Sequence, residues 1–445
     1  MPRFSAAKDL PVLAPVQVVP PWTGPVLRRN MAATGKHGQA RSAKSKCPRF
    51  QGNPGPSWAV GALAAGASIA ITIGLATPAR AALSGSDWTM AKLAPRYAKS
   101  LVEDAGGHEP VSCVPGTKFC VAIVPDIKNL VNGSSIGQAA LITRDAGRTW
   151  TGHATLPSTF LVDALSCATK NVCWVTGTTW ATGGPAVAET VDGGKTWTDK
   201  TPADWANAPW WAFAIDCPTA TTCWMVGPTG FSQDPSVEKT TDGGATWTLF
   251  GNLPTVPSTP IGTYELNGIS CVSADSCVAV GGLNGGSGPA RVITTTDGGA
   301  TWSLSASAAL SGVQQLMDVS CLPAAGGGTT CYGAGVTFAS DTGTAESLVL
   351  ASQDDGATWA QVESLADNGW FNSISCASTR NCWAAGAGSD DALAGTSDGG
   401  SSWSTVTSDT TNELGSVSCL SGSTCVAVTD NGVWVTSDDG GADAG

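Results

Sequence analysis

The chain has 445 residues, 55 Gly, 18 Trp and a formal net charge of −12. Residues 1–81 hold ten of the 23 basic residues and one acid, so residues 82–445 carry 13 basic and 34 acidic residues, a net charge of −21. This charge excludes a nucleic-acid-binding protein and predicts a surface that repels anionic lipid. The abundance of Gly, Ser, Thr and Val favours strands and turns over helices.

The first 81 residues read as a basic leader followed by a secretory signal peptide. The run 58–76 is apolar, basic residues from Arg41 to Arg49 precede it, and Ala79-Arg80-Ala81 has the small residues of a cleavage site. We therefore expect cleavage after Ala81 and a secreted or cell-envelope protein. The alternative is an uncleaved membrane anchor, because the run is long enough to span a bilayer. Translation starts at Met1 or at Met31.

The next element, residues 86–93 (SDWTMAKL), is predicted as a strand. It resembles the segments TWTLFGNL and TWSLSASA, which follow later turns of the chain. The last repeat ends in TSDDGG at 436–441 without a Trp and without a fourth strand. We expect residues 86–93 to supply that strand, with Trp88 replacing the missing Trp. The alternative is an unstructured start.

Fourteen cysteines follow the leader in seven local pairs, five of them spaced C-x5-C. The even number in an exported chain predicts disulfides, whereas this spacing is not that of a zinc site. We therefore expect no metal, no cofactor and no thiol nucleophile. The pairs are Cys113/Cys120, Cys167/Cys173, Cys217/Cys223, Cys271/Cys277, Cys321/Cys331, Cys376/Cys382 and Cys419/Cys425.

A repeat of four predicted strands fills the rest of the chain. In residues 266–305 the strands are 266–272, 277–282, 291–296 and 301–305, and TDGGA forms the last turn. Four antiparallel strands per repeat predict a seven-bladed β-propeller over residues 82–445, with one disulfide joining the first two strands of each blade at their turn. A calcium site in the turns is not expected, because each offers one central carboxylate.

The turn before each fourth strand follows the template S/T-x-D-x-G-x-T/S-W. TTDGGATW occurs at 240–247 and again at 295–302. The Asp is expected to accept backbone N–H groups, the Gly to supply conformational freedom and the Trp to plug the blade. The template is centred on Asp145, Asp192, Asp242, Asp297, Asp354, Asp398 and Asp438.

These repeats resemble the Asp-box, or bacterial neuraminidase repeat, of sialidases, sortilin, xyloglucan-cleaving propellers and photosystem II assembly-factor propellers. The S-C-x5-C-x-A-x-G element joined to T-x-D-G-G-x-T-W looks most like exported bacterial proteins that are sialidase-like or assembly-factor-like. The resemblance implies the fold and a structural role for the turn, away from any active site. It does not transfer chemistry.

Catalytic residues are sparse after the leader. Arg96, Arg144, Arg148, Arg291 and Arg380 are the only arginines, which argues against the arginine cluster of a sialidase. The only histidines are His108 and His153, which disfavours histidine triads. A glycoside hydrolase would need two carboxylates, and the candidates near the starts of inner strands are Glu109, Asp163, Glu265 and Glu413.

The loops opposite the disulfides and aspartate turns are rich in aromatic residues, which could stack on sugars or anchor a peptide. The sequence thus predicts a monomeric, non-catalytic binding or assembly scaffold, with a polysaccharide-acting hydrolase as the alternative. Its partner would be a basic or neutral protein or glycan of the cell envelope. The binding candidates are Trp180, Trp205, Trp211, Phe231, Tyr264 and Trp370, joined by Trp210, Phe338 and Phe371; Trp210, Trp211 and Trp370 could instead pack between blades.

Overall fold

The chain divides into two compact units, Met1–Arg80 and Ala81–Gly445, seen in a computed structural model. The described residues all belong to the second unit, so the predicted leader lies outside them. No helix among them is long and apolar enough to cross a membrane. They are residues 88–93, 110–126, 137–157, 160–179, 183–207, 211–229, 234–251, 253–254, 264–283, 289–338, 343–365, 369–388, 393–405, 414–429 and 432–436.

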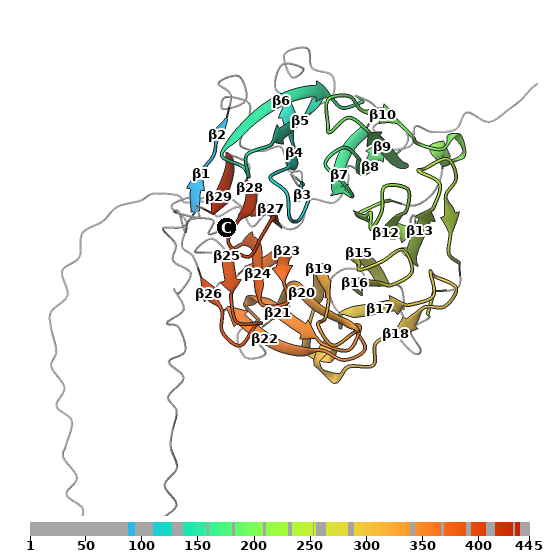
Figure 1. The fold of residues 1–445 in the computed structure, drawn as a ribbon. Coiled ribbons are helices and arrows are strands. Elements are labelled where there is room, and N and C mark those ends of the chain that lie inside the picture. Colours follow the sequence, from blue (N-terminus) through green and yellow to red (C-terminus); the bar gives the residue numbers. More distant parts are fainter. Residues whose placement is uncertain are drawn as a thin grey trace, which may run out of the picture. The chain divides into compact units, whose positions relative to one another are not determined.

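The described elements are strands and two short 3-10 helices, and the strands form small, mostly antiparallel sheets arranged as a propeller (Figure 1). Four sheets have four strands. They are β7 (Phe160–Cys167), β8 (Cys173–Thr179), β9 (Pro185–Thr190) and β10 (Thr198–Asp199); β11 (Ala214–Asp216), β12 (Cys223–Thr229), β13 (Asp234–Thr240) and β14 (Thr248–Leu249); β23 (Trp370–Ser378), β24 (Asn381–Ala387), β25 (Leu393–Thr396) and β26 (Ser404–Thr405); and β27 (Leu414–Cys419), β28 (Cys425–Thr429) and β29 (Gly432–Thr436) with β1 (Trp88–Met90).

The other two sheets are wider. A five-stranded sheet holds β3 (Val111–Cys113), β4 (Cys120–Asp126), β5 (Gly137–Thr143), β6 (Thr149–Thr155) and β2 (Lys92–Leu93), which pairs parallel to β6. An eight-stranded sheet holds β15 (Tyr264–Cys271), β16 (Cys277–Leu283), β17 (Arg291–Thr295), β18 (Ser303–Leu304), β19 (Gln315–Pro323), β20 (Thr329–Phe338), β21 (Ala345–Ser352) and β22 (Ala360–Leu365). The 3-10 helices are η3 (Ala203–Asn207) and η5 (Ala308–Gly312).

The predicted count of seven separate blades is therefore wrong for the described strands. Five of the six sheets are single blades, and the sixth is twice as wide as a blade. The wide sheet is joined by one bridge, between Gly282 of β16 and Gln315 of β19. A Cβ at Gly282 would lie 3.0 Å from the carbonyl oxygen of Gln314, so the absence of a side chain lets these backbones approach. The Gln315 amide also donates to Glu265 at 2.7 Å.

The first strands of successive repeats line the inside of the ring, and the last strands lie outside (Figure 1). Contacts run from β3 to β7, β11, β15, β19, β23 and β27 in turn, and β27 contacts β3. The ring is closed next to this last contact by β1, which pairs antiparallel with β29 from Trp88↔Thr436 to Met90↔Trp434. Strand β1 thus occupies the outer position of a sheet whose other strands come from the end of the chain.

A cyclic set of hydrogen bonds joins neighbouring first strands. The donor is the backbone N–H of the cysteine in one first strand. The acceptor lies in the preceding first strand and is the side chain of the residue just before its cysteine. Backbone donors at the boundary between repeats are satisfied in this way. Six acceptors are serines and the seventh is Asp216. The pairs are Cys167–Ser112 (3.0 Å), Cys217–Ser166 (3.0 Å), Cys271–Asp216 (2.6 Å), Cys321–Ser270 (3.0 Å), Cys376–Ser320 (3.1 Å), Cys419–Ser375 (3.0 Å) and Cys113–Ser418 (2.9 Å).

All seven predicted cysteine pairs form disulfides, each between the first and second strands of a repeat. The bonded pairs are Cys113 with Cys120, Cys167 with Cys173, Cys217 with Cys223, Cys271 with Cys277, Cys321 with Cys331, Cys376 with Cys382, and Cys419 with Cys425.

Two of these bridges differ from the expected placement at the turn, because their second cysteine does not begin its strand. Cys331 is the third residue of β20, and Cys382 is the second residue of β24. The ladders there continue past the disulfide towards the turn, with Pro323 opposite Thr329 in one sheet and Ser378 opposite Asn381 in the other. These two bridges therefore lie within a ladder rather than at its end.

A Gly four residues after the second cysteine faces a bulge in the first strand. A Cβ at Gly177 would lie 1.7 Å from the carbonyl oxygen of Leu161, and one at Gly281 would lie 1.9 Å from that of Glu265. Any side chain there would therefore displace the bulged strand.

The aspartate turns repeat one hydrogen-bond pattern, seen at Asp242. Its Oδ1 accepts from the backbone N–H of Thr246 and the hydroxyl of Thr240, both at 2.9 Å, and its Oδ2 accepts from the hydroxyl of Thr246 at 2.6 Å. These bonds, led by that of the Thr246 hydroxyl, lower the pKa of Asp242 to about 2. Asp145, Asp192, Asp297, Asp354 and Asp398 have equivalent partners, and Asp438 lies outside the described residues.

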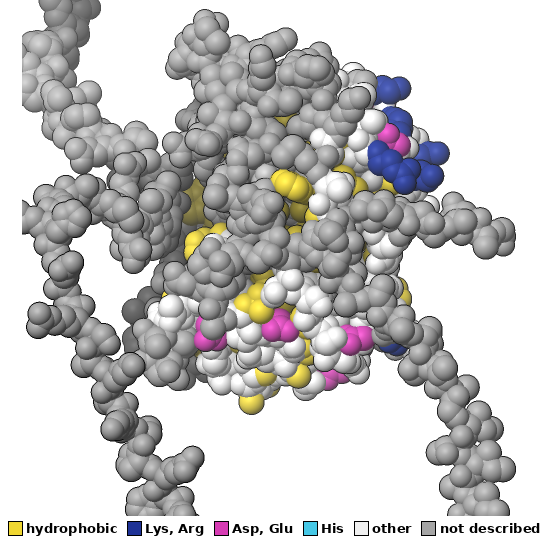
Figure 2. Space-filling model, turned by 90° about the vertical axis from the view of Figure 1, so that its left-hand side faces the viewer, with side chains coloured by type: hydrophobic (Ala, Val, Ile, Leu, Met, Phe, Trp, Pro, Cys, Tyr) yellow, Lys and Arg dark blue, Asp and Glu magenta, His cyan; other side chains and the backbone are white. Residues whose placement is uncertain are grey.

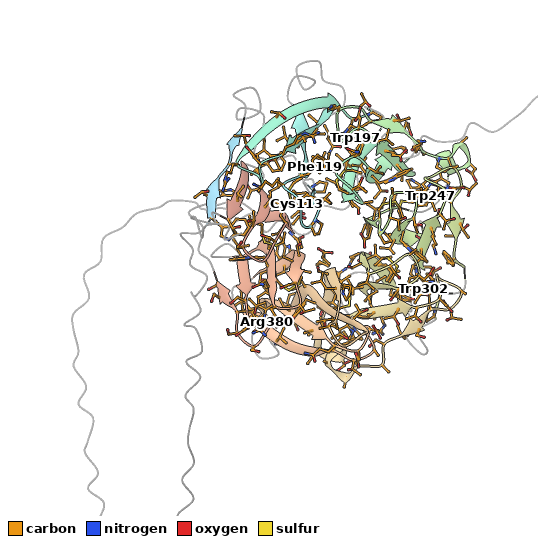
Figure 3. All side chains as sticks on the ribbon, viewed as in Figure 1. Cys113, Phe119, Trp197, Trp247, Trp302 and Arg380 are labelled. Atoms are coloured by element: carbon orange, nitrogen blue, oxygen red, sulfur yellow. A yellow bond between two sulfur atoms is a disulfide. The ribbon has the colours of Figure 1, made fainter. Side chains whose placement is uncertain are left out.

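The tryptophan of a turn packs edge-on against a tryptophan in the second strand of the preceding repeat. Trp247 meets Trp174 with centroids 6.1 Å apart at 81°, and Trp302 meets Trp224 at 5.8 Å and 86°. Trp88 of β1 meets Trp383 in the same way, at 5.2 Å and 87°. Trp247 and Trp302 lie in the outer part of the ring, with Trp197 (Figure 3). Trp88 thus makes the contact that a turn tryptophan makes elsewhere.

Candidate functional site

The strand order gives the ring two faces. The disulfide-bearing turns and the aspartate turns lie at one face, here called the turn face. The loops that leave the second strands and enter the first strands lie at the opposite face, the loop face. Binding residues concentrate on loops held by a rigid scaffold, so the loop face is where a site is first expected.

Three of the predicted loop-face aromatics are buried, which corrects the expectation that they are exposed. Trp205 is 7% exposed and lies 5.6 Å from Trp247. Tyr264 is 2% exposed and its hydroxyl donates to the carbonyl of Pro254 at 3.0 Å. Phe371 is fully buried. These rings fill space between neighbouring sheets, where burial of a large apolar side chain stabilises the fold.

Trp211 is half-buried, and its indole N–H donates to the carbonyl of Gly183 at 2.7 Å. It therefore ties the segment before β11 to the loop of the preceding sheet. Trp180, Trp210 and Phe231 lie outside the described residues.

Two of the loop-face aromatic side chains that the structure describes are exposed. Phe338 ends β20 with 48% of its surface exposed, and Trp370 begins β23 with 38% exposed. Strands β20 and β23 contact each other, and the antiparallel order places the end of one and the start of the other at the same face. Exposed large aromatics on neighbouring sheets are features of a binding surface.

The inner wall near the loop face carries carboxyl groups. Asp163 lies at the bulge of β7, and the hydroxyl of Thr178 donates to it at 3.2 Å. The carboxyl group is surrounded by other protein atoms, although part of the residue is in contact with solvent. This burial of the carboxyl raises the pKa of Asp163 to about 7. Burial also raises the pKa of Glu265, whose carboxylate accepts the bond from Gln315. Glu109 and Glu413 lie outside the described residues.

Two more inner-wall acids, Asp216 and Asp318, were not candidates from the sequence. Burial raises the pKa of each to about 6. Asp216 accepts the N–H of Cys271, and Asp318 accepts the N–H of Ile374 at 2.9 Å and the hydroxyl of Ser373 at 3.2 Å. Both carboxyls therefore join neighbouring sheets. A signal for Asp216 was present in the sequence, because Asp216 stands just before a cysteine at a position where the other repeats have Ser.

Other chemistry has little support among the described side chains. No group of three or more His, Cys, Asp or Glu there is placed to hold a metal ion. Arg291 donates through Nη1 to the carbonyls of Pro289 and Ala290, each at 3.1 Å, so its guanidinium is engaged by its own segment.

Comparison with known proteins supports the fold and leaves the function open. No family of sequences and no curated protein matches the chain. The structure is similar to that of YCF48 bound to D1 peptide, at 15% identity and a TM-score of 0.50 over 75% of this chain and 93% of that one. YCF48 from Cyanidioschyzon merolae is 14% identical, with a TM-score of 0.51 over 78% and 98% of the two chains.

A GH74 enzyme from Niastella koreensis is 17% identical, with a TM-score of 0.50 over 76% of this chain and 53% of that enzyme. YCF48 and a GH74 enzyme thus have structures similar to the same scaffold. At these identities the similarity concerns the fold alone. The chain is an all-β propeller with seven local disulfides, a bond type characteristic of oxidising, extracytoplasmic compartments.

Proposed function

We propose that the chain is an exported, non-catalytic β-propeller that binds a protein or glycan of the cell envelope through its loop face. The observation that carries this proposal is the exposure of Phe338 and Trp370 on neighbouring sheets of that face. Their rings offer apolar area that a partner can bury, which is how aromatic anchors act at interfaces. The similarity to a propeller solved with a bound peptide supports the same reading.

The test compares the full chain with the double variant Phe338→Ala/Trp370→Ala. Capture of partners from an envelope fraction and binding to a glycan array are measured for both. We expect the double variant to lose binding while its melting temperature stays close to that of the wild type. Leu249→Ser is the matched control, since Leu249 is 54% exposed on a strand away from the pair. Equal binding by the wild type and the double variant would refute the proposal.

The second candidate is a glycoside hydrolase, favoured by Asp163. A carboxyl with a pKa of about 7 is protonated in about half of the molecules at neutral pH, and the protonated form could donate its proton to a leaving group. Hydrolysis also needs a second carboxylate, for which Glu265 is the described candidate. Release of reducing ends from a panel of soluble polysaccharides is the assay. Turnover by the wild type that disappears in both Asp163→Asn and Glu265→Gln would favour this function over the scaffold.

A further inference from the structure

The turn face carries a cluster of exposed cations in an otherwise acidic protein. Figure 2 shows most of the visible lysine and arginine side chains gathered in one area, with one acidic side chain among them and most of the acidic side chains towards the other end of the described surface. Five exposed cations stand on the turns of two neighbouring sheets, β3–β6 and β7–β10. They are Lys118, Arg144, Arg148, Lys170 and Lys195, here called the basic patch.

Backbone and side-chain contacts bring these residues together. The N–H of Ala146 donates to the carbonyl of Lys118 at 3.0 Å, which joins Lys118 to the turn that holds Arg144 and Arg148. A Cβ built on Gly193, in the neighbouring turn, would lie 3.0 Å from Nη2 of Arg144 and 2.8 Å from the carbonyl oxygen of Lys170. Arg144 thus spans the boundary between the two sheets.

The aspartate turn does not need these cations. Arg148 and Lys195 occupy the position before the Thr of the template. The same position holds Ala245, Ala300 and Ala357 in other turns, whose hydrogen bonds are the same. Arg148 and Lys195 are therefore additions to a turn that is complete without them.

Their charges are not neutralised by ion pairs within the described part of the chain. The ion pairs there are Lys200–Glu189 at 3.4 Å and Lys239–Asp275 at 3.9 Å, neither of which involves the patch. Asp145 and Asp192 stand in the same turns, but their oxygens accept bonds from the turn's own N–H and hydroxyl groups. Two carboxylates against five cations leave the patch net positive.

We propose that the basic patch docks the propeller onto the anionic phospholipid surface of a membrane. The cations stand on turns and are exposed, so a broad surface can reach them together. Val191, 64% exposed, adds an apolar side chain to the same face. The described fold also begins at this face, because Trp88 of β1 pairs with Thr436, the last residue of β29, and the strand order places that end of β29 at the turn face.

This inference reverses the expectation of lipid repulsion drawn from the net charge of −21. Charges further away than a Debye length, about 10 Å at moderate salt, are screened, so the nearest charges dominate at contact. The proposal does not depend on the proposed function, since the patch lies on the face opposite Phe338 and Trp370.

The test measures sedimentation of the full chain with two kinds of vesicle. Pure phosphatidylcholine vesicles give the baseline, including any binding by the apolar run 58–76. The second kind holds phosphatidylglycerol and phosphatidylcholine in equal amounts. The additional protein that sediments with these vesicles, above the baseline, is called the anionic excess. We expect an excess that falls with added salt, and we expect Arg148→Ala/Lys195→Ala to reduce it by about tenfold. Alanine is chosen because the other turns accept it.

The control is Lys200→Ala/Arg380→Ala, which removes two cations outside the patch and is expected to keep the excess. Equal melting temperatures of the two double variants show that any difference is not loss of folding. The proposal is overturned if the anionic excess is absent, or if the patch variant and the control reduce it equally. It is also overturned if soluble polyglutamate binds to the patch while anionic vesicles do not.

Discussion

At the scale of single residues, Trp205 and Trp370 are both binding candidates from the sequence but have opposite environments. Trp205 is packed against Trp247, whereas much of Trp370 faces solvent. We predict that Trp205→Ala lowers the free energy of unfolding by about 3–5 kcal/mol, because it leaves a cavity. Trp370→Ala should lower it by less than about 1 kcal/mol. Denaturant titration measures both, and similar losses for the two variants would contradict the assignment.

Asp163 predicts a pH dependence of stability. Its pKa is about 7 in the folded state, above the ordinary value of 3.8, so the folded state holds this proton where the unfolded state has released it. The free energy of unfolding should therefore fall as pH rises from about 4 to about 7. Asp163→Asn, which keeps an oxygen for the Thr178 hydroxyl, should flatten this fall. The slope should not vanish, because Asp216 and Asp318 also have raised pKa values.

At the scale of elements, β1 is held by its ladder to β29 and by the contact of Trp88 with Trp383. We predict that Trp88→Ala lowers the free energy of unfolding by about 3 kcal/mol, since a 7% exposed ring would be lost. The exposed Thr89 provides a matched control as Thr89→Ala, with a small expected effect. Deletion of residues 82–93 should lower the melting temperature further. An unchanged melting temperature would mean that the ring is stable without this strand.

The elements themselves could be predicted from the sequence because their causes are local. The cysteine spacing, the alternation in residues 266–305 and the turn template each act within a few residues. Contacts between repeats could not be read in this way. The Gly282–Gln315 bridge, the burial of Trp205 and Tyr264 and the convergence of Lys118 with Lys195 all depend on how neighbouring sheets pack. Of the candidate aromatic residues that the structure describes, Trp370 and Phe338 are the two that it shows exposed.

At the scale of the whole molecule, the disulfides are distributed evenly, one to each repeat. Each joins residues six to ten positions apart, so each constrains a short loop. We predict that Cys271→Ala/Cys277→Ala costs about 2 kcal/mol of stability, the chain-entropy value for such a loop. Denaturant titration measures this loss, and peptide mapping without reductant should recover the other six pairs. Pairing of cysteines from different repeats in the variant would show that the repeats do not fix their own bridges.

The pairing of β1 with β29 also determines the order in which parts of the molecule can fold. The hydroxyl of Thr89 donates to the carbonyl of Val435, 346 positions away, whereas the disulfides bridge neighbours in sequence. Covalent bridges can therefore form repeat by repeat as the chain reaches an oxidising compartment, but β1 has no partner strand until β29 is present. Closing so long a segment is slow compared with local pairing. During that interval β1 is an unpaired strand that another chain could pair with, so slow ring closure exposes the protein to association between molecules.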